Sequence, residues 1–336
     1  MSARPLRSAI LLLAVLCCTA PQAFAGTFKI ATLSPDGSSW MRLMRSGAEE
    51  IATRTDGRVK FKFYPGGVMG DDAAVLRKIR FGQLQGAAVT AGALTVFYPD
   101  MQLYNMPMVF RGYAEVDAVR AQLDGVLEAG LAEEGYEVFG FGEAGFAYAM
   151  SQVRATSVED ARRQKVWVPA NDDGALKAIE GFGITPVPLS IADVLTGLQT
   201  DLIDAVAVPP VGALALQWHT QVDYLLDLPL IYVFGVLAVD GKAFARESEA
   251  DRAVVHEVMR ARFDEITRIN RQDHDAALAA LQNQGIEVLQ PSDEDVAQWR
   301  ARAESSRASM VEAEVVSDAL YDRLEAILAD FREVAP

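Results

Sequence analysis

The sequence predicts an α/β fold, in which short strands alternate with helices. Between residues 165 and 210, three short apolar runs (166–168, 185–189 and 205–208) are separated by two segments that begin with helix-capping residues. The first part of the chain shows the same alternation, and residues 248–284 contain neither Pro nor Gly. Strands that alternate with helices indicate a parallel sheet with helices on its faces, and ligands of such sheets bind beyond the carboxyl ends of the strands.

The N-terminus has the pattern of a secretory signal peptide. Arg4 and Arg7 precede the apolar run 9–16, and Ala25 ends a small-residue cleavage site. Because this run is too short to span a bilayer, we predict a signal peptide over residues 1–25 and secretion of the mature chain. A buried N-terminal helix is the alternative interpretation.

Both cysteines lie within the predicted signal peptide. Lipid attachment at Cys17 is an alternative to cleavage after Ala25, but the bulky Leu16 does not match the small residue that such processing prefers. Cleavage after Ala25 also removes Cys18, so the mature chain would have no thiol and no disulfide. That composition suits an oxidising compartment in which stability comes from the apolar core.

The predicted mature chain is strongly acidic. Removal of Arg4 and Arg7 from the 31 Lys and Arg leaves 29 basic residues against 46 acidic ones, a net charge of −17. This charge argues against nucleic acid or an anionic membrane surface as a partner. The length suits one large domain or two of moderate size.

The elements before residue 165 follow from local patterns. Strands are expected at 27–33, 59–63 and 86–90, with helices from Ser38 or Ser39 to about residue 53 and from Asp71 to about residue 81. A helix is expected at 115–135, followed by strands at 136–141 and 146–151, the second of which crosses between domains.

The glycines between the last two strands match a phosphate-binding pattern, G-x-G-x-x-G, at Gly140, Gly142 and Gly145. The helix that such a turn requires does not follow, so we expect a flexible corner between the strands instead. Further strands are expected at 224–228 and 232–239.

The C-terminal third is helical. Ser248 and Asp251 form a capping signal for one unusually long helix to about residue 284, long enough to run along two domains. His256 and His274 are expected on its solvated side, and a second helical region begins at Ser292.

No motif for catalysis is present in the sequence. G-x-S-x-G, H-E-x-x-H and G-x-x-x-x-G-K-[ST] are missing, and His219, His256 and His274 share no spacing of metal ligands. The pair Asp172-Asp173 is compatible with a metal site, but a helix cap is the favoured interpretation. We therefore expect no enzyme, no cofactor and no metal.

Several motifs together resemble one family. They are Tyr64-Pro65-Gly66-Gly67 with Gly70-Asp71-Asp72, then Lys165-Val166-Trp167-Val168-Pro169, and Leu198-Gln199-Thr200 with Ile203-Asp204. In order and spacing the mature chain resembles the periplasmic substrate-binding subunits of TRAP (tripartite ATP-independent periplasmic) transporters, the DctP-like family.

The resemblance implies a two-lobed periplasmic-binding-protein fold, with a long helix that braces both lobes. Lobe I would comprise 26–146 with part of 235–270, and lobe II 147–234 with part of 271–336. It implies hinge closure on one small ligand, delivery to an integral-membrane TRAP permease driven by an ion gradient, and no catalysis.

Two departures from the family pattern concern the ligand. Trp167 stands where the family usually has the Arg that pairs with a carboxylate, and Val208 stands where it usually has an Asn. Ala147 aligns with a second basic position. For Trp40 and Ile191, ordinary core packing is an equally good interpretation. The resemblance and these departures predict a pocket lined by Ser34, Trp40, Asp72, Thr90, Phe146, Tyr148, Trp167, Ile191 and Val208.

This lining predicts a mostly apolar or aromatic ligand, such as a hydrophobic monocarboxylate. Two carboxylates buried without a cationic partner would be unfavourable by several kcal/mol. An anion could still be held by Ser34, Thr90 and backbone N–H groups, or by a basic residue such as Arg77. Members without the family's Arg suggest a periplasmic tetratricopeptide-type accessory partner, and a sensing subunit for a membrane receptor is the alternative function.

Overall fold

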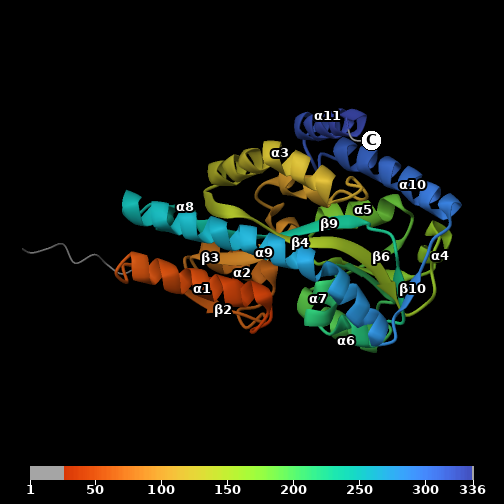
Figure 1. The fold of residues 1–336 in the computed structure, drawn as a ribbon, viewed down its shortest axis with the longest axis horizontal. Helices are drawn as coiled ribbons and strands as arrows, with labels where there is room; N and C mark the ends of the chain where they lie inside the picture. The colour runs from red at the N-terminus through yellow and green to blue at the C-terminus, as the bar shows by residue number, and fades with distance from the viewer. Residues whose placement is uncertain (1–25, 335–336) are drawn as a thin grey trace, which may run out of the picture.

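The computed structural model describes residues 26–334, and the predicted signal peptide lies outside this range. The strands follow one path in the order β2-β1-β3-β9-β4-β7-β5-β6, with β8 and β10 beside it. The strands at one end belong to lobe I and those at the other end to lobe II, while β9 and β4 join them in the middle (Figure 1). The α/β fold with two lobes is therefore confirmed, whereas the residue boundaries of the lobes stay a prediction.

Lobe I is built from three parallel strands, β1 (Gly26–Thr32), β2 (Val59–Tyr64) and β3 (Gly86–Thr90). Helix α1 (Ser39–Arg54) joins the first two, and α2 (Asp72–Arg80) joins the second and third. Each helix starts where a side chain caps it: Ser38 accepts from the Met41 amide at 3.2 Å and Asp71 from the Ala74 amide at 2.7 Å.

Lobe II repeats this arrangement with β5 (Lys165–Pro169), β6 (Thr185–Leu189) and β7 (Ala205–Val208), also parallel. Helix α5 (Asp173–Gly181) follows β5, α6 (Val194–Gln199) follows β6 through the short η3 (Ile191–Asp193), and α7 (Pro210–Ala215) follows β7. Asp172 caps α5 by accepting from the Ala175 amide at 2.8 Å, as predicted. A short α4 (Val158–Ala161), η4 (Trp218–Gln221), β8 (Tyr224–Leu226) and β10 (Glu287–Leu289) complete the lobe.

The two crossing strands are β4 (Tyr136–Ser151) and β9 (Ile231–Asp240), which pair in antiparallel fashion. The prediction of two strands separated by a flexible corner is wrong, because β4 is continuous through its glycines. The ladder absorbs them as irregularities between Val138 and Phe141 and between Glu143 and Gly145. Gly140 and Gly145 take φ values of +121° and +103°, so these glycines allow bulges inside the strand rather than a break.

Helix α9 (Glu249–Asn283) has 35 residues and spans roughly 52 Å. It contacts α1 of lobe I, the crossing strand β4 and α7 of lobe II, and in Figure 1 it runs across the middle of the molecule. The predicted bracing helix is thus confirmed.

The solvated positions predicted for two histidines on α9 are wrong. His256 is half-buried against Phe139 and Phe244, and His274 lies against Tyr148 and Tyr113. Both rings lie on the flank of the apolar stripe, where aromatic side chains of the crossing strands reach them.

The remaining helices cover the outer faces. They are α3 (Tyr113–Glu133), α8 (Gly241–Phe244), α10 (Asp293–Glu312) and α11 (Asp318–Val334), with η1 (Ala91–Leu94) and η2 (Pro99–Asn105) between β3 and α3. α10 packs on α5 of lobe II, and α11 packs on α3. No helix within residues 26–334 is both long enough and apolar enough to cross a membrane.

Candidate functional site

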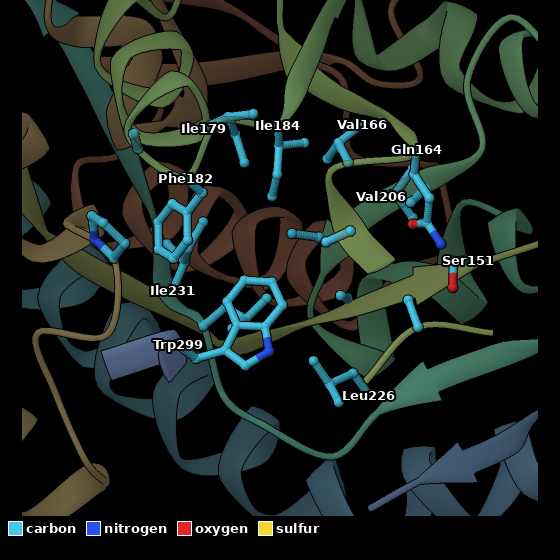
Figure 2. Close-up of a pocket in the computed structure, with 18 of the residues that line it drawn as sticks. Ser151, Gln164, Val166, Ile179, Phe182, Ile184, Val206, Leu226, Ile231 and Trp299 are labelled. Atoms are coloured by element: carbon cyan, nitrogen blue, oxygen red, sulfur yellow. The ribbon is translucent and has the colours of Figure 1, made fainter. Parts of the chain in front are cut away.

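Two cavities are candidates for a ligand site, and their walls distinguish them. The first, of about 60 Å³, lies inside lobe II on the sheet face that carries Ala149, Ala205 and Ala207. Figure 2 shows the side chains of Val166, Phe182, Ile184 and Trp299 around it. Lobe II supplies most of the wall of this first cavity, so the cavity does not depend on lobe closure. We interpret it as a packing void left by the three small alanine side chains.

The second cavity, of about 190 Å³, lies between the lobes. Lobe I contributes one face of α2 and the segment after η1, and lobe II contributes the two residues after β5. It is lined by Asp72, Ala73, Leu76, Arg77, Arg80, Ala93, Val96, Phe97, Ala170 and Asn171. Lobe I supplies most of this wall, and Ala170 and Asn171 of lobe II complete it only when the lobes are close together.

The lobes touch directly beside this cavity. Asp172, at the start of α5, lies so close to Gly92 of η1 that a Cβ atom built on Gly92 would be 2.0 Å from Asp172 Oδ2. Asp172 Oδ1 is held in place because it caps α5. The preceding residue, Asn171, adopts a left-handed conformation with φ of +67°, which turns the chain from β5 into this contact. The structure is therefore a closed one.

Two guanidinium groups line the cavity without protein partners. Within residues 26–334, the guanidinium groups of Arg77 and Arg80 take part in no hydrogen bond or ion pair, and the Arg80 guanidinium lies 5.8 Å from the centre of the Phe97 ring. The third basic residue in the last turn of α2, Lys78, instead donates to the Met69 carbonyl at 2.6 Å. The cavity thus has two unpaired cations on one helix face.

Two carboxyl groups at the interlobe contact are unusually hard to ionise. Burial, reinforced by the neighbouring Asp71, raises the pKa of Asp72 to about 6. Burial also raises the pKa of Asp172 to about 6, although backbone amides at the start of α5 act in the opposite direction.

These shifts predict that the unfolding free energy falls as the pH rises. A carboxyl with a folded-state pKa above its ordinary value of 3.8 binds its proton more tightly when folded, so its stabilising effect is lost between about pH 4 and pH 6. Asp172→Asn keeps the helix cap without a charge. As the pH rises from about 4 to about 6, its unfolding free energy should increase relative to that of wild type by as much as about 3 kcal/mol.

Urea unfolding at pH 4.5, 5.5 and 7 would measure this effect, with Asp273→Asn on the exposed side of α9 as the control. Equal pH dependence of wild type and Asp172→Asn would contradict the prediction.

Four predicted site residues lie together in one apolar cluster on lobe II and the crossing strands. Tyr148 is opposite Val208 in the β4–β7 ladder, and Trp167 packs edge-on against Trp218 at 5.0 Å while its Nε1 donates to the Leu189 carbonyl at 3.0 Å. Phe146 packs against Tyr113 at 5.0 Å. All four are between 5 and 9% exposed. Their neighbours are protein side chains, and none of the four lines the interlobe cavity.

Trp40, in the first turn of α1, packs on the crossing strands, away from the other aromatic residues predicted for the site. Its ring covers Gly142 and Gly235 and packs against Phe263 at 5.4 Å. Its indole Nε1 is buried and has no hydrogen-bond partner among the described residues. A Cβ on Gly142 would lie 2.5 Å from this ring, so glycine at that position serves the packing of Trp40.

The other predicted residues are half-buried at strand ends. Ser34 follows β1 and shares a 2.9 Å hydrogen bond with Ser38, Thr90 ends β3, and Ile191 begins η3 after β6. Asp72 alone among the predicted residues lines the interlobe cavity. Within the described residues, no group of three His, Cys, Asp or Glu side chains could hold a metal ion.

The sequence interpretation missed most of the cavity wall. It gave Arg77 only as an alternative and did not assign Arg80, Phe97 or Asn171 to the ligand site. The available signal was the i, i+3 spacing of the two arginines after the predicted helix start at Asp71, which places both on one helix face.

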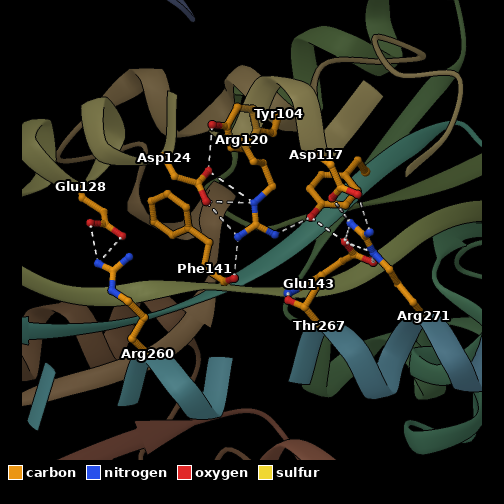
Figure 3. A network of polar contacts seen from close by, with 11 residues as sticks. Tyr104, Asp117, Arg120, Asp124, Glu128, Phe141, Glu143, Arg260, Thr267 and Arg271 are labelled. Atoms are coloured by element: carbon orange, nitrogen blue, oxygen red, sulfur yellow. Dashed lines mark hydrogen bonds and ion pairs between the residues drawn. The ribbon is translucent and has the colours of Figure 1, made fainter. Parts of the chain in front are cut away.

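A buried polar chain runs across the crossing strands (Figure 3). Arg120 of α3 donates to the Tyr232 hydroxyl at 3.1 Å, and that hydroxyl donates to Glu143 Oε2 at 3.0 Å. Arg271 of α9 donates to the same carboxylate at 2.7 Å and to the exposed Asp117. Glu143 is fully buried on β4. The chain therefore ties both crossing strands to helices on either side of them.

Comparison with known proteins identifies one family, and two similar curated proteins are periplasmic solute-binding proteins of the same kind. A family model described as bacterial extracellular solute-binding protein, family 7, matches residues 30–314. The sialic acid-binding periplasmic protein SiaP of Vibrio cholerae is 21% identical over 272 residues, covering 80% of this chain and 84% of that one. The 2,3-diketo-L-gulonate-binding periplasmic protein YiaO of Escherichia coli is 25% identical, covering 71% and 73%.

Solved structures agree on the fold. A TRAP periplasmic solute-binding protein from Ralstonia eutropha with bound (S)-2-acetolactate superimposes with a TM-score of 0.84 at 18% identity, covering 91% of this chain and 99% of that chain. One from Desulfovibrio salexigens with bound orotic acid gives a TM-score of 0.83 at 16% identity, with the same coverage.

Proposed function

The chain belongs to family 7 of the bacterial extracellular solute-binding proteins, the DctP family of TRAP transporters, and we propose that it captures a small, mostly apolar or aromatic monocarboxylate by lobe closure. Proteins of this family work in the periplasm, bind small molecules and deliver them to a membrane permease. We further propose that this chain binds its ligand without catalysis. A tetratricopeptide-type accessory partner stays a prediction of the sequence resemblance.

The interlobe cavity is the observation that carries this proposal. A ligand in it touches α2 of lobe I and the end of β5 of lobe II at once. Such a ligand makes its full set of contacts only in the closed state and so shifts the population toward closure. At about 190 Å³ the cavity is smaller than sites for drug-sized ligands, which start near roughly 300 Å³, so it suits a small metabolite.

The chemistry of the wall favours one carboxylate attached to an apolar body. Two arginines without ion pairs and a single acidic residue, Asp72, line the cavity, which favours an anion. The rest of the lobe I wall is aliphatic or aromatic, from Leu76, Val96 and Phe97. The lobe II part of the wall, Ala170 and Asn171, carries no charge, so a second ligand carboxylate there would be desolvated without a charged partner. Organic acids bound to the solved relatives are consistent with an anionic ligand.

A thermal-shift screen tests this proposal. The full chain would be expressed with its own leader, and the exported protein would be mixed with 4-methyl-2-oxopentanoate, phenylacetate, succinate, galacturonate and the neutral phenylacetamide. A ligand at a hundred times its dissociation constant stabilises the folded state by about 2.7 kcal/mol. We expect a rise in Tm with the apolar monocarboxylates only. A rise restricted to succinate or galacturonate would refute the apolar monocarboxylate.

A further inference from the structure

We propose that Arg77 and Arg80 of α2 are the residues that bind the ligand carboxylate. This inference rests on the proposed function and assigns the recognition of the anion to lobe I. Trp167 and Val208 of lobe II, which the sequence singled out, do not line the cavity and would not hold the charge of the ligand.

The geometry of α2 places both guanidinium groups on the same wall. Residues three apart on a helix lie on neighbouring positions of one face, and both Arg77 and Arg80 line the interlobe cavity. Two donors on one face can bind the two oxygens of one carboxylate, each through a charge-assisted hydrogen bond. Lys78, between them, points elsewhere because its ammonium group is bonded to the Met69 carbonyl.

The available hydrogen-bonding capacity of the two arginines supports the assignment. Three other arginines of lobe I have carboxylate partners: Arg45 pairs with Asp36, Arg54 with Glu50 and Glu257, and Arg58 with Asp251. Arg42 has none and donates to the Gly37 carbonyl and the Ser39 hydroxyl. Among the described residues Arg77 and Arg80 have none, although the chain is rich in acidic groups. Arg80 also stacks over Phe97, which fixes its position at the cavity wall.

The net charge of the cavity wall favours a ligand with one negative charge. The charged residues of the wall are Asp72, Arg77 and Arg80, so the wall carries a net charge of +1 when Asp72 is ionised. One carboxylate balances this charge, whereas a dicarboxylate would leave one negative charge in excess. The apolar body of the ligand would then lie on Leu76, Phe97 and Val96, and Val96 is 58% exposed without a ligand.

Closure adds the opposite wall. Ala170 and Asn171 of lobe II face α2 across the cavity, and the Asn171 side chain forms no hydrogen bond with the described residues. When the lobes separate, a carboxylate held by α2 would stay with lobe I and lose its contacts with lobe II. The structure thus assigns first capture of the ligand to lobe I.

The test uses isothermal titration calorimetry with phenylacetate and phenylacetamide as a charged and a neutral probe of the same shape. The variants are Arg77→Gln, Arg80→Gln and the double variant, with Arg300→Gln as the matched control. Arg300 is an exposed residue of α10 that has no hydrogen bond or ion pair in the described part of the chain.

We expect each single substitution to weaken phenylacetate binding about tenfold and the double substitution about a hundredfold, while the control changes it less than twofold. Binding of phenylacetamide should change little in any variant. The Tm of each unliganded variant should stay within about 2 °C of wild type, since both side chains are exposed.

The outcomes separate the two proposals. If wild type binds phenylacetate and the double variant binds it equally well, the assignment of the arginines is refuted while the proposed function stands. If wild type binds no apolar monocarboxylate but binds succinate or a sugar acid, the proposed function fails, and with it this assignment to a single carboxylate.

Discussion

Replacement of Gly92 by alanine is expected to weaken ligand binding at least tenfold while the protein remains folded. The added Cβ would lie 2.0 Å from Asp172 Oδ2, below any normal contact distance, so the closed lobes would have to separate or Asp172 would have to move. Asp172 is held as the cap of α5, so its movement is itself unfavourable. A variant that closes less readily has a lower apparent affinity, because only the closed state makes the full set of contacts.

Calorimetry with the ligand found in the thermal-shift screen measures this effect, and two further variants identify its cause. Gly125→Ala is the matched control, because a Cβ at Gly125 in the middle of α3 meets no atom within 4 Å. The double variant Gly92→Ala with Asp172→Ala removes the clash and should recover most of the affinity lost in Gly92→Ala. Equal affinity in Gly92→Ala and wild type would show that the observed interlobe contact is not part of the ligand-bound state.

The sequence was sufficient to predict the fold because local signals and the global arrangement agree. Capping residues at Ser38, Asp71, Asp172 and Ser248 mark helix starts that the structure confirms. The exception is β4, where glycines suggested a corner. Glycine allows either a turn or a bulge, and pairing with β9 from Tyr136 to Ala147, across all three glycines, decided the outcome in favour of a bulge.

The candidate site was predicted less well, because a cavity between lobes depends on contacts distant in the sequence. A residue at a strand end, such as Val208 at the end of β7, is recognisable from the order of the elements. Trp167 was expected at a strand end as well, but it lies in the middle of β5 because the strand continues to Pro169. Whether an indole faces a ligand or another side chain is decided by its neighbours, here Trp218, which lies 51 positions later in the chain. Asn171 and Phe97 meet at the cavity only through closure, for which the sequence has no local signal.

Glu143→Ala is expected to destabilise the protein by about 3–5 kcal/mol, the usual effect of breaking a buried ion pair. The Glu143 carboxylate is fully buried and accepts from Arg271 and from Tyr232, both of which would lose a charged partner. These groups lie on β4, β9 and α9, the elements that join the lobes. Their loss should therefore lower the stability of the whole molecule and loosen the connection between the lobes.

Asp117→Ala provides a stringent control, because Asp117 binds the same Arg271 from the exposed side of the pair. Its side chain is 60% exposed, so its loss should change the unfolding free energy by less than about 1 kcal/mol. Urea unfolding monitored by fluorescence would give the unfolding free energies of the two variants, which are directly comparable when their m-values are equal. Similar small losses in both would mean that water or a rearranged Arg271 replaces the Glu143 carboxylate, and that the polar chain does not determine the stability of the crossing strands. A large loss in Glu143→Ala alone would show that the buried end of the pair holds the crossing strands to α9.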